Sequence, residues 1–170
     1  MSSAPLRLGG FFTWNGGRDD PHVYIRPART GADGHPRRLA GGDTRSHRLA
    51  SYDPIKGGLV VDAAVFEREG ARMLSDIADT DLIIMDELGF LESEAPLFRQ
   101  AALDALDAGV PALGVLRLGN VPWHDDIKRK TGVSLYDVSI ENRDNLPREI
   151  AGAISDILAR LNNLNSLLTE

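Results

Sequence analysis

The first part of the chain alternates short apolar stretches with clusters of glycine, proline and polar residues. The clusters "GGRDDP" and "TGADGHP" are typical of turns, because glycine and proline favour the backbone angles that turns require. Around them lie "LRLGGFFTWN", "HVYIRPA" and "RRLAGG", which predict strands at residues 6–15, 22–28 and 37–42. Short strands joined by tight turns pair side by side, so we predict an antiparallel hairpin region within residues 1–50.

The period of the apolar positions changes after residue 58, from that of strands to that of a helix. Asp62 is a suitable N-cap, and the residues after it predict a helix of about four turns. The apolar positions that recur at helical spacing are Val65, Phe66, Met73, Leu74 and Ile77. The run "DLIIM" at 81–85 then predicts a strand that is buried on both faces.

Strands and helices continue to alternate to the end of the chain. A helix is predicted from a cap at Ser93 to Gly109, followed by a strand at "VPALGVLR" and a short helix in "WHDDIKRKTG". A strand at "SLYDVS" (134–139) and a terminal helix from about Asp144 complete the pattern. This alternation predicts a largely parallel α/β sheet covered by helices, in one domain with a hairpin-rich lobe at 1–50 and an α/β core at 51–170.

Composition narrows the class of protein. With 42% apolar and 26% charged residues of both signs, the chain is typical of a soluble globular protein. No stretch approaches the roughly 18 apolar residues of a membrane span, and the start lacks the apolar core of a signal peptide. We therefore expect a cytoplasmic protein without a membrane partner. The absence of cysteine excludes disulfides and thiolate metal sites.

The net charge of −6 hides an asymmetry along the chain. Residues 1–50 hold eight arginines and four acidic residues, whereas 51–170 hold eleven basic and twenty-one acidic residues. The arginines are spread through turns rich in glycine and proline, which favours a solvated surface over a nucleic-acid interface. We therefore expect no nucleic-acid partner.

The carboxyl ends of the predicted parallel strands hold the candidate chemistry, because ligands of open α/β sheets bind there. Those ends are Asp86-Glu87, Arg117 and residues 139–143, which we expect to converge on one crevice. In phosphate-cleaving sites a strand-end Asp orders a hydrated Mg²⁺ ion and the next Glu polarises the attacking water. The alternative is an acid pair that only ends a strand and caps the following turn.

Three motifs carry a family resemblance: "GGFFT" near the start, "DELGFLE" at 86–92 and "SIENRDNLP" at 139–147. Together, in this order, they resemble the bacterial and archaeal nucleoside triphosphatases of the THEP type, relatives of the animal cancer-related nucleoside triphosphatase. The resemblance covers about residues 9–150 and implies a P-loop-NTPase-like fold. It also implies an enzyme that hydrolyses nucleoside triphosphates such as ATP or GTP with Mg²⁺. It also implies that Asp86 is the magnesium-side acid and Glu87 the catalytic base.

The resemblance extends to residues near the nucleotide, each with a structural alternative. Asn142 and Arg143 resemble family residues that lie close to the bound nucleotide, but they also fit the capped start of a helix. Arg117 could neutralise phosphate charge or form a surface ion pair. Trp14 could stack on a base or pack on its own hairpin. His124 and the two acids after it suit a helix start better than a metal site.

One family feature is missing from the chain. The resemblance implies an initial strand followed by the loop G-x-x-x-x-G-K-S/T, whose backbone N–H groups and lysine hold the phosphates. The chain has only three lysines, Lys56, Lys128 and Lys130, and none follows a glycine. We predict that the match begins at the second strand of the family, so that about thirty residues with the first strand, P-loop and helix are absent.

A missing interior strand leaves its neighbours, such as "LIIM" or "ALGVL", with unpaired backbone groups that cost about 1–3 kcal/mol each when buried. A partner chain that carries the P-loop, a second copy in a homo-oligomer, or direct pairing of the flanking strands would fill the gap. Two functions stay open. One is a THEP-type triphosphatase, or the Walker-B half of one, that binds ATP or GTP weakly by itself. The other is a catalytically inactive relative that acts as a binding or assembly module.

Overall fold

The computed structural model describes residues 5–29 and 46–168, so the strand predicted at 37–42 lies outside the described residues. The chain divides into two compact units, Met1–Ile127 and Lys128–Glu170. The described strands of the predicted hairpin lobe belong to the same sheet as the strand that carries Asp86. The division of one domain into a lobe at 1–50 and a core at 51–170 stays a prediction.

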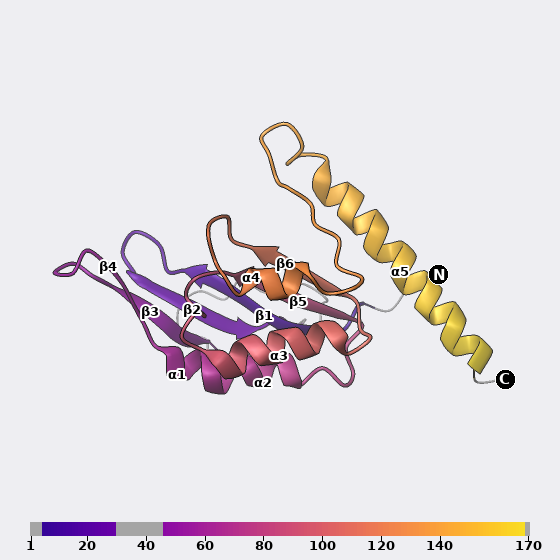
Figure 1. The fold of residues 1–170 in the computed structure, drawn as a ribbon, viewed down its shortest axis with the longest axis horizontal. Coiled ribbons are helices and arrows are strands. Elements are labelled where there is room, and N and C mark those ends of the chain that lie inside the picture. The colour runs from indigo at the N-terminus through magenta and orange to yellow at the C-terminus, as the bar shows by residue number, and fades with distance from the viewer. Residues whose placement is uncertain (1–4, 30–45, 169–170) are drawn as a thin grey trace. The chain divides into compact units, whose positions relative to one another are not determined.

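The first unit is built on one six-stranded sheet with the order β4-β3-β2-β1-β5-β6 (Figure 1). Its strands are β1 Leu8–Asn15, β2 His22–Pro27, β3 His47–Asp53, β4 Gly58–Val61, β5 Leu82–Leu88 and β6 Ala112–Leu116. Strands β1 to β4 pair antiparallel in chain order, and β5 and β6 continue the sheet parallel to β1. The predicted fold class, an antiparallel hairpin region joined to a parallel α/β sheet, is confirmed.

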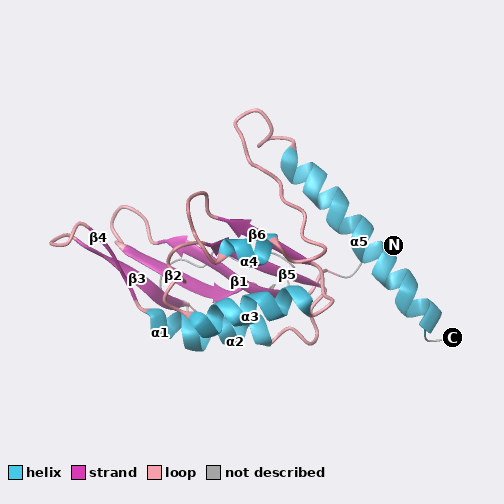
Figure 2. Ribbon diagram, in the orientation of Figure 1, coloured by secondary structure: helices cyan, strands magenta, loops and turns pink. Residues whose placement is uncertain are grey.

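Helices cover one face of this sheet in the first unit (Figure 2). They are α1 Ala63–Val65, a π-helical turn η1 Phe66–Gly70, α2 Ala71–Ser75, α3 Pro96–Asp107 and α4 His124–Lys128. Asp62 is the N-cap of α1, although its side chain makes no capping hydrogen bond. The predicted cap at Ser93 is wrong, since the N-cap of α3 is Ala95 and the fixed φ of Pro96 suits the first helical position.

The core lies between the helices and the sheet. Phe98 of α3 is its centre, with the ring of Phe11 edge-on at 5.4 Å and that of Phe66 at 5.1 Å. All three rings are fully buried, and such aromatic pairs add about 0.5–1.5 kcal/mol to the free energy of area burial. These contacts join β1, η1 and α3. They hold the helices against the sheet and so support strands β1 and β5.

Strand β5 confirms the prediction of a strand buried on both faces. Its first four residues, Leu82 to Met85, are each at most 8% exposed. Asp86 and Glu87 follow in the same strand and are only partly buried. Strand β5 is thus apolar over its first four residues and carries two carboxylates near its carboxyl end.

The second unit corrects two predictions. Residues 134–139 form no strand, and the described residues provide no neighbouring strand that bonds to them. Instead, the Asn142 side chain links two backbone groups of this segment. It accepts a hydrogen bond from Ser139 N at 2.8 Å and donates one to Asp137 O at 2.8 Å. The terminal helix α5, Leu146–Leu168, begins two residues later than predicted. None of the helices in the described parts of the chain combines the length and apolar character needed to cross a bilayer.

Candidate functional site

The carboxyl end of β5 holds Asp86 and Glu87 beside strand β1. The strand register pairs Asp86 with Phe12. The next residue of β1, Thr13, fixes the backbone of both acids: its hydroxyl donates to Asp86 O at 3.1 Å and accepts from Glu87 N at 3.2 Å. Thr13 ends the motif "GGFFT", but no role for it followed from the sequence, because this contact joins residues more than seventy positions apart.

Arg117 reaches the same edge from the neighbouring parallel strand. It directly follows β6, and its backbone N–H donates to Leu88 O at 2.8 Å. Its guanidinium Nη1 donates to Glu87 Oε1 at 2.7 Å and lies 5.0 Å from the ring centre of Phe90. The structure thus brings together two of the three stretches that were predicted to converge, and Arg117 forms an ion pair with Glu87. Its predicted role at a phosphate stays a prediction.

The charges at the carboxyl ends of β5 and β6 favour the binding of a cation. Burial raises the pKa of Asp86, and the negative charge of Glu87 raises it further. Arg117 is bonded to Glu87, so a positive ion at Asp86 would offset the charge of the second carboxylate. Mg²⁺ prefers hard oxygen ligands and commonly takes one or two carboxylates, with water and phosphate oxygens completing its shell.

The donor set fits a hydrated Mg²⁺ ion better than a metal enclosed by protein. Within the described residues, no group of three or more His, Cys, Asp or Glu side chains is arranged to hold a metal. His124 begins α4, is 2% exposed and packs its ring 5.2 Å from that of Trp123. The helix-start interpretation of His124 fits this placement.

The turn after β5 is held by a buried carboxyl group. Gly89 N donates to Glu92 Oε2 at 2.8 Å, and Trp123 Nε1 donates to Gly89 O at 3.0 Å. Glu92 is only 2% exposed, and burial raises its pKa to about 7 despite the hydrogen bond from Gly89. A Cβ at Gly89 would lie 3.2 Å from Arg117 Cδ, so the glycine leaves room for that side chain. The motif "DELGFLE" therefore also shapes the turn that supports Arg117.

Asn142 and Arg143 lie in the second unit, so their predicted role near the nucleotide stays a prediction. Their local contacts fit the structural alternative. Asn142 bridges Ser139 and Asp137 in the turn before α5, and Arg143 Nε lies 4.0 Å from the Asp144 carboxylate. These bonds prepare the start of the terminal helix.

Trp14 packs on its own sheet, as the hairpin interpretation predicts. Its ring stacks on Tyr24 of β2 with a centroid distance of 5.4 Å and an interplanar angle of 21°. Arg26 lies over both Trp14, at 5.7 Å, and Phe12, at 5.8 Å. Cross-strand packing of this kind stabilises the β1–β2 hairpin.

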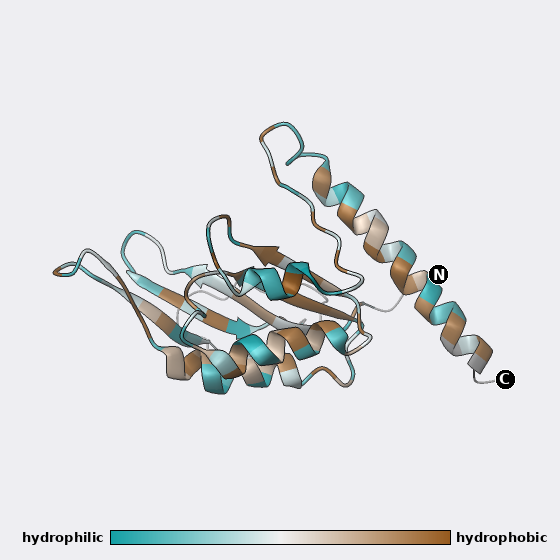
Figure 3. Cartoon of the chain, viewed as in Figure 1, coloured by the Kyte–Doolittle hydropathy of each residue, from teal (hydrophilic) through white to brown (hydrophobic). Residues whose placement is uncertain are grey.

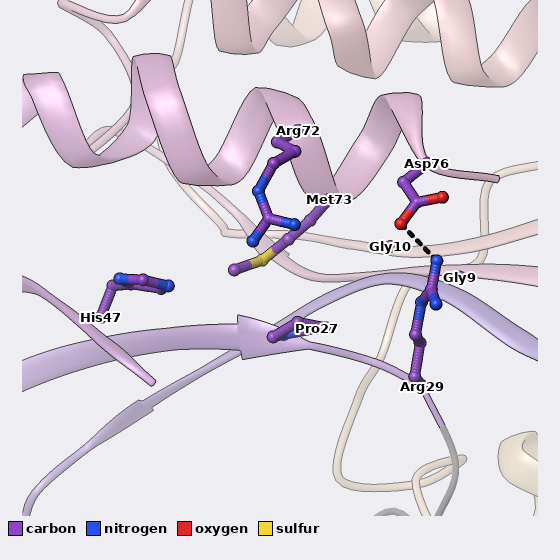
Figure 4. A pocket seen from close by; sticks show the side chains of 8 residues that line it. All are labelled: Gly9, Gly10, Pro27, Arg29, His47, Arg72, Met73 and Asp76. Atoms are coloured by element: carbon purple, nitrogen blue, oxygen red, sulfur yellow. Dashed lines mark hydrogen bonds and ion pairs between the residues drawn. The ribbon is translucent and has the colours of Figure 1, made fainter. Parts of the chain in front are cut away.

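A pocket of about 350 Å³ lies near the start of β1, at the end of the sheet opposite Asp86 (Figure 4). It is lined by Gly9, Gly10, Pro27, Arg29, His47, Arg72, Met73 and Asp76. Its charges are largely paired within the protein: Arg29 bonds Asp76, while Arg72 Nη2 lies 3.1 Å and His47 Nε2 3.5 Å from Glu69. Nothing in the sequence predicted this pocket, because its lining comes from four separate segments.

The sheet presents an Asp-Glu pair at the carboxyl end of a buried parallel strand, which is where ligands of open α/β sheets bind. The chain belongs to the NTPase family, since the model described as NTPase matches residues 32–151. It is 29% identical over 165 residues to the nucleoside-triphosphatase THEP1 of Thermofilum pendens, covering 94% of this chain and 86% of that relative. With the THEP1 of Methanosarcina acetivorans it shares 32% over 134 residues, which is 74% of this chain and 75% of that relative.

Two solved structures share the fold. The crystal structure of THEP1 from the hyperthermophile Aquifex aeolicus matches with a TM-score of 0.65 at 21% identity, over 87% of this chain and 84% of that one. The solution structure of a human cancer-related nucleoside triphosphatase matches at 0.62 and 23%, over 88% and 82%. The predicted resemblance to THEP-type triphosphatases is thereby confirmed, whereas the loss of the first strand and P-loop stays a prediction.

Proposed function

We propose that the protein takes part in Mg²⁺-dependent hydrolysis of nucleoside triphosphates such as ATP and GTP to the diphosphate and phosphate. The observation that carries this proposal is the acid pair at the end of β5, with Glu87 Oε1 bonded to Arg117 at 2.7 Å. Membership of the NTPase family supports the same chemistry. Because nucleoside triphosphates are cytoplasmic metabolites, we propose the cytoplasm as its location.

Asp86 is the residue that would hold the ion, through one carboxylate oxygen or an intervening water. When bound, Mg²⁺ supplies positive charge to the phosphate oxygens during the transfer. The partial burial of Asp86 strengthens its interaction with a cation, because fewer water molecules screen the charge. Thr13 keeps the backbone of Asp86 in place through its hydroxyl group.

Glu87 is the proposed general base. Water attacks the γ-phosphorus while the bond to the β–γ bridging oxygen breaks, and one water proton passes to the Glu87 carboxylate. The bond from Arg117 orients this carboxylate, whose remaining lone pairs are able to accept the proton. The proton then returns to solvent or to the released phosphate. The predicted contact of Asn142 and Arg143 with a nucleotide stays a proposal.

The phosphates need more donors than this edge provides. The 170 residues contain no G-x-x-x-x-G-K-S/T motif, and Arg117 already binds Glu87. We propose that a phosphate-binding loop outside these residues completes the site, so that the chain alone binds ATP and GTP weakly. The alternative, an inactive relative that serves as an assembly module or homo-oligomer, is favoured by the exposed apolar residues of β6 and of residues 135–140.

Phosphate release from ATP and GTP tests the base assignment under single-turnover conditions with excess protein. Replacing Glu87 with Gln keeps the size of the side chain but removes its ability to accept a proton, so we expect a loss of about 10²–10³-fold. Glu94→Gln makes the same change at an exposed acid beyond the turn and serves as the control. Equal rates for Glu87→Gln and the unmodified chain would refute the assignment. No release and no nucleotide binding by calorimetry in either would favour the inactive alternative for the chain alone.

A further inference from the structure

A buried carboxyl group that the proposed chemistry does not use lies beside the candidate site. Glu92, in the turn after β5, is only 2% exposed. Figure 3 shows β5 and β6, the strands that lead to this turn and to Arg117, as largely apolar. Burying a carboxyl group is costly unless hydrogen bonds compensate for the lost water. The hydrogen bond that Glu92 accepts therefore indicates its role.

One peptide group connects Glu92 to Arg117. Its N–H group, that of Gly89, donates to Glu92 Oε2 at 2.8 Å. Its C=O group, that of Leu88, accepts from Arg117 N at 2.8 Å. The two bonds act on the same rigid plane, because the peptide bond resists rotation. Leu88 and Gly89 are both buried, so water is a poor substitute for either partner. Glu92 thus fixes the orientation of the peptide to which the backbone of Arg117 is bonded.

The side chain of Arg117 also follows this turn closely. A Cβ on Gly89 would lie 3.2 Å from Arg117 Cδ and 3.8 Å from Glu92 Oε2. The guanidinium continues to Glu87 Oε1 at 2.7 Å and lies 5.0 Å from the ring centre of Phe90, the next residue of the turn. A shift of the turn would therefore move the guanidinium that orients the proposed base.

We propose that Glu92 is a positioning residue: by accepting the Gly89 hydrogen bond, it keeps Arg117 where the guanidinium orients Glu87. For its effect on phosphate release this inference rests on the proposed function, whereas the effect on Arg117 is independent of any nucleotide. Trp123 Nε1, which donates to Gly89 O at 3.0 Å, supports the following peptide from the side of α4. The alternative is a carboxyl group that only stabilises the turn.

The protonation state of Glu92 gives this role a pH dependence. Burial raises the pKa of Glu92 to about 7, and the charge of Glu87 acts in the same direction, against backbone hydrogen bonds and the charge of Arg117. Ionisation places a second carboxylate beside Arg117, in competition with Glu87. The adjoining helices carry two further ionisable side chains, Arg99 on α3 and His124 on α4. We expect Arg117 to be held most firmly on Glu87 while Glu92 is protonated.

Amide hydrogen exchange of the full chain without nucleotide measures the positioning directly. Glu92→Met keeps a side chain of similar length but removes the acceptor, so exchange at the Gly89 and Arg117 amides should be at least about tenfold faster. Glu67→Met is the matched control, because Glu67 also accepts a backbone hydrogen bond, from Leu97 N at 3.0 Å. It should speed exchange at Leu97 but alter the Gly89 and Arg117 amides by less than about twofold. Urea unfolding of both variants checks that the fold is retained.

The pH dependence provides a test without a destabilised variant. In the unmodified chain, the NMR signals of the Gly89 amide and of the Arg117 Nε–H group should shift together with a midpoint at about pH 7. Glu92→Gln accepts the same hydrogen bond but does not ionise, so both shifts should disappear while exchange at the two backbone amides stays slow. Shifts that persist in Glu92→Gln would come from another group, such as His124, and would overturn the pH dependence.

Single-turnover phosphate release tests the consequence for the reaction. Glu92→Met should lower the rate at saturating nucleotide about tenfold without changing the half-saturating concentration, because Glu92 is buried and acts through Arg117. In an Arg117→Lys background the same change should lower the rate by less than about twofold, since the guanidinium is already absent. Glu92→Gln should retain the rate that the unmodified chain shows below the midpoint.

The outcomes separate the positioning role from the proposed function. Faster exchange at the Gly89 and Arg117 amides of Glu92→Met, without phosphate release in any variant, would support the positioning role and count against the proposed function. Unchanged exchange at Arg117, or a full tenfold loss of rate in the Arg117→Lys background, would overturn the positioning role. An equal acceleration at Arg117 in Glu67→Met would do the same, since Glu92 would then only stabilise the fold.

Discussion

The two ends of the β1–β5 pair use their charged residues differently. At the amino end, Arg7 binds Asp81 through three hydrogen bonds, and the acids around the pocket are paired with Arg29, Arg72 and His47. At the carboxyl end, Arg117 is bonded to Glu87, while burial and the charge of Glu87 raise the pKa of the neighbouring Asp86. Charges that satisfy one another stabilise the fold, whereas an excess of one sign on a strand end is suited to a ligand.

The largest expected difference between the two ends is in the free energy of unfolding that is lost when a glycine is replaced by alanine. Gly10 has a φ of +83°, and a Cβ there would lie 2.0 Å from Ile84 O, a backbone atom that cannot move aside. We expect Gly10→Ala to lower the free energy of unfolding by about 3 kcal/mol or more. Gly89→Ala meets only the flexible Arg117 side chain at 3.2 Å, and we expect about 1 kcal/mol. Urea unfolding of both variants measures the difference, and similar losses would show that the amino end is not the more tightly packed.

The pH dependence of stability should have opposite signs at the two ends. The pKa of Glu92 is raised from 4.5 to about 7, so its ionised form is disfavoured in the folded state. Its contribution to stability is greatest below pH 4.5 and declines as the pH rises to about 7, by roughly 2–3 kcal/mol. At the amino end, hydrogen bonds from Arg7 lower the pKa of Asp81, so that stability is present above pH 3.8 and is lost as the pH falls through the folded pKa.

Unfolding in urea between pH 3 and pH 8 measures both effects. Glu92→Gln should flatten the decline between pH 4.5 and 7, because glutamine accepts the Gly89 hydrogen bond without ionising. Asp81→Asn should leave this decline unchanged and remove part of the loss in acid. A decline of unchanged size in Glu92→Gln would mean that another group causes it.

The smallest effect concerns the two arginines that bind acids at opposite ends. Arg117→Lys keeps the charge but loses the planar guanidinium that donates to Glu87 and lies over Phe90. We expect phosphate release to fall about tenfold, with the free energy of unfolding changed by less than about 0.5 kcal/mol. Arg72→Lys, at the pocket, should change neither quantity beyond error. Equal effects of the two variants on phosphate release would remove the distinction between the ends.

Local patterns were sufficient where one element depends on its own residues. The buried run of β5 and the acids after it were predicted from "DLIIMDE" because a strand covered on both faces must be apolar along its whole length. The turn "GGRDDP" between β1 and β2 was predicted from glycine and proline for a similarly local reason. Predictions failed where the structure of a segment depends on a neighbouring strand. Residues 134–139 have the composition of a strand, but a strand needs a hydrogen-bonding partner, and the described residues provide none.

The sequence by itself thus determined the α/β class, the family resemblance and the Asp86-Glu87 pair with its predicted chemistry. Only the tertiary structure showed that Thr13 fixes the backbone of this pair, that Glu92 is buried beneath the turn and that Arg117 reaches Glu87. It also placed β6 last in the order of the described strands. The physical reason is that contacts between distant residues depend on strand order and register, which the pattern of a single segment does not contain.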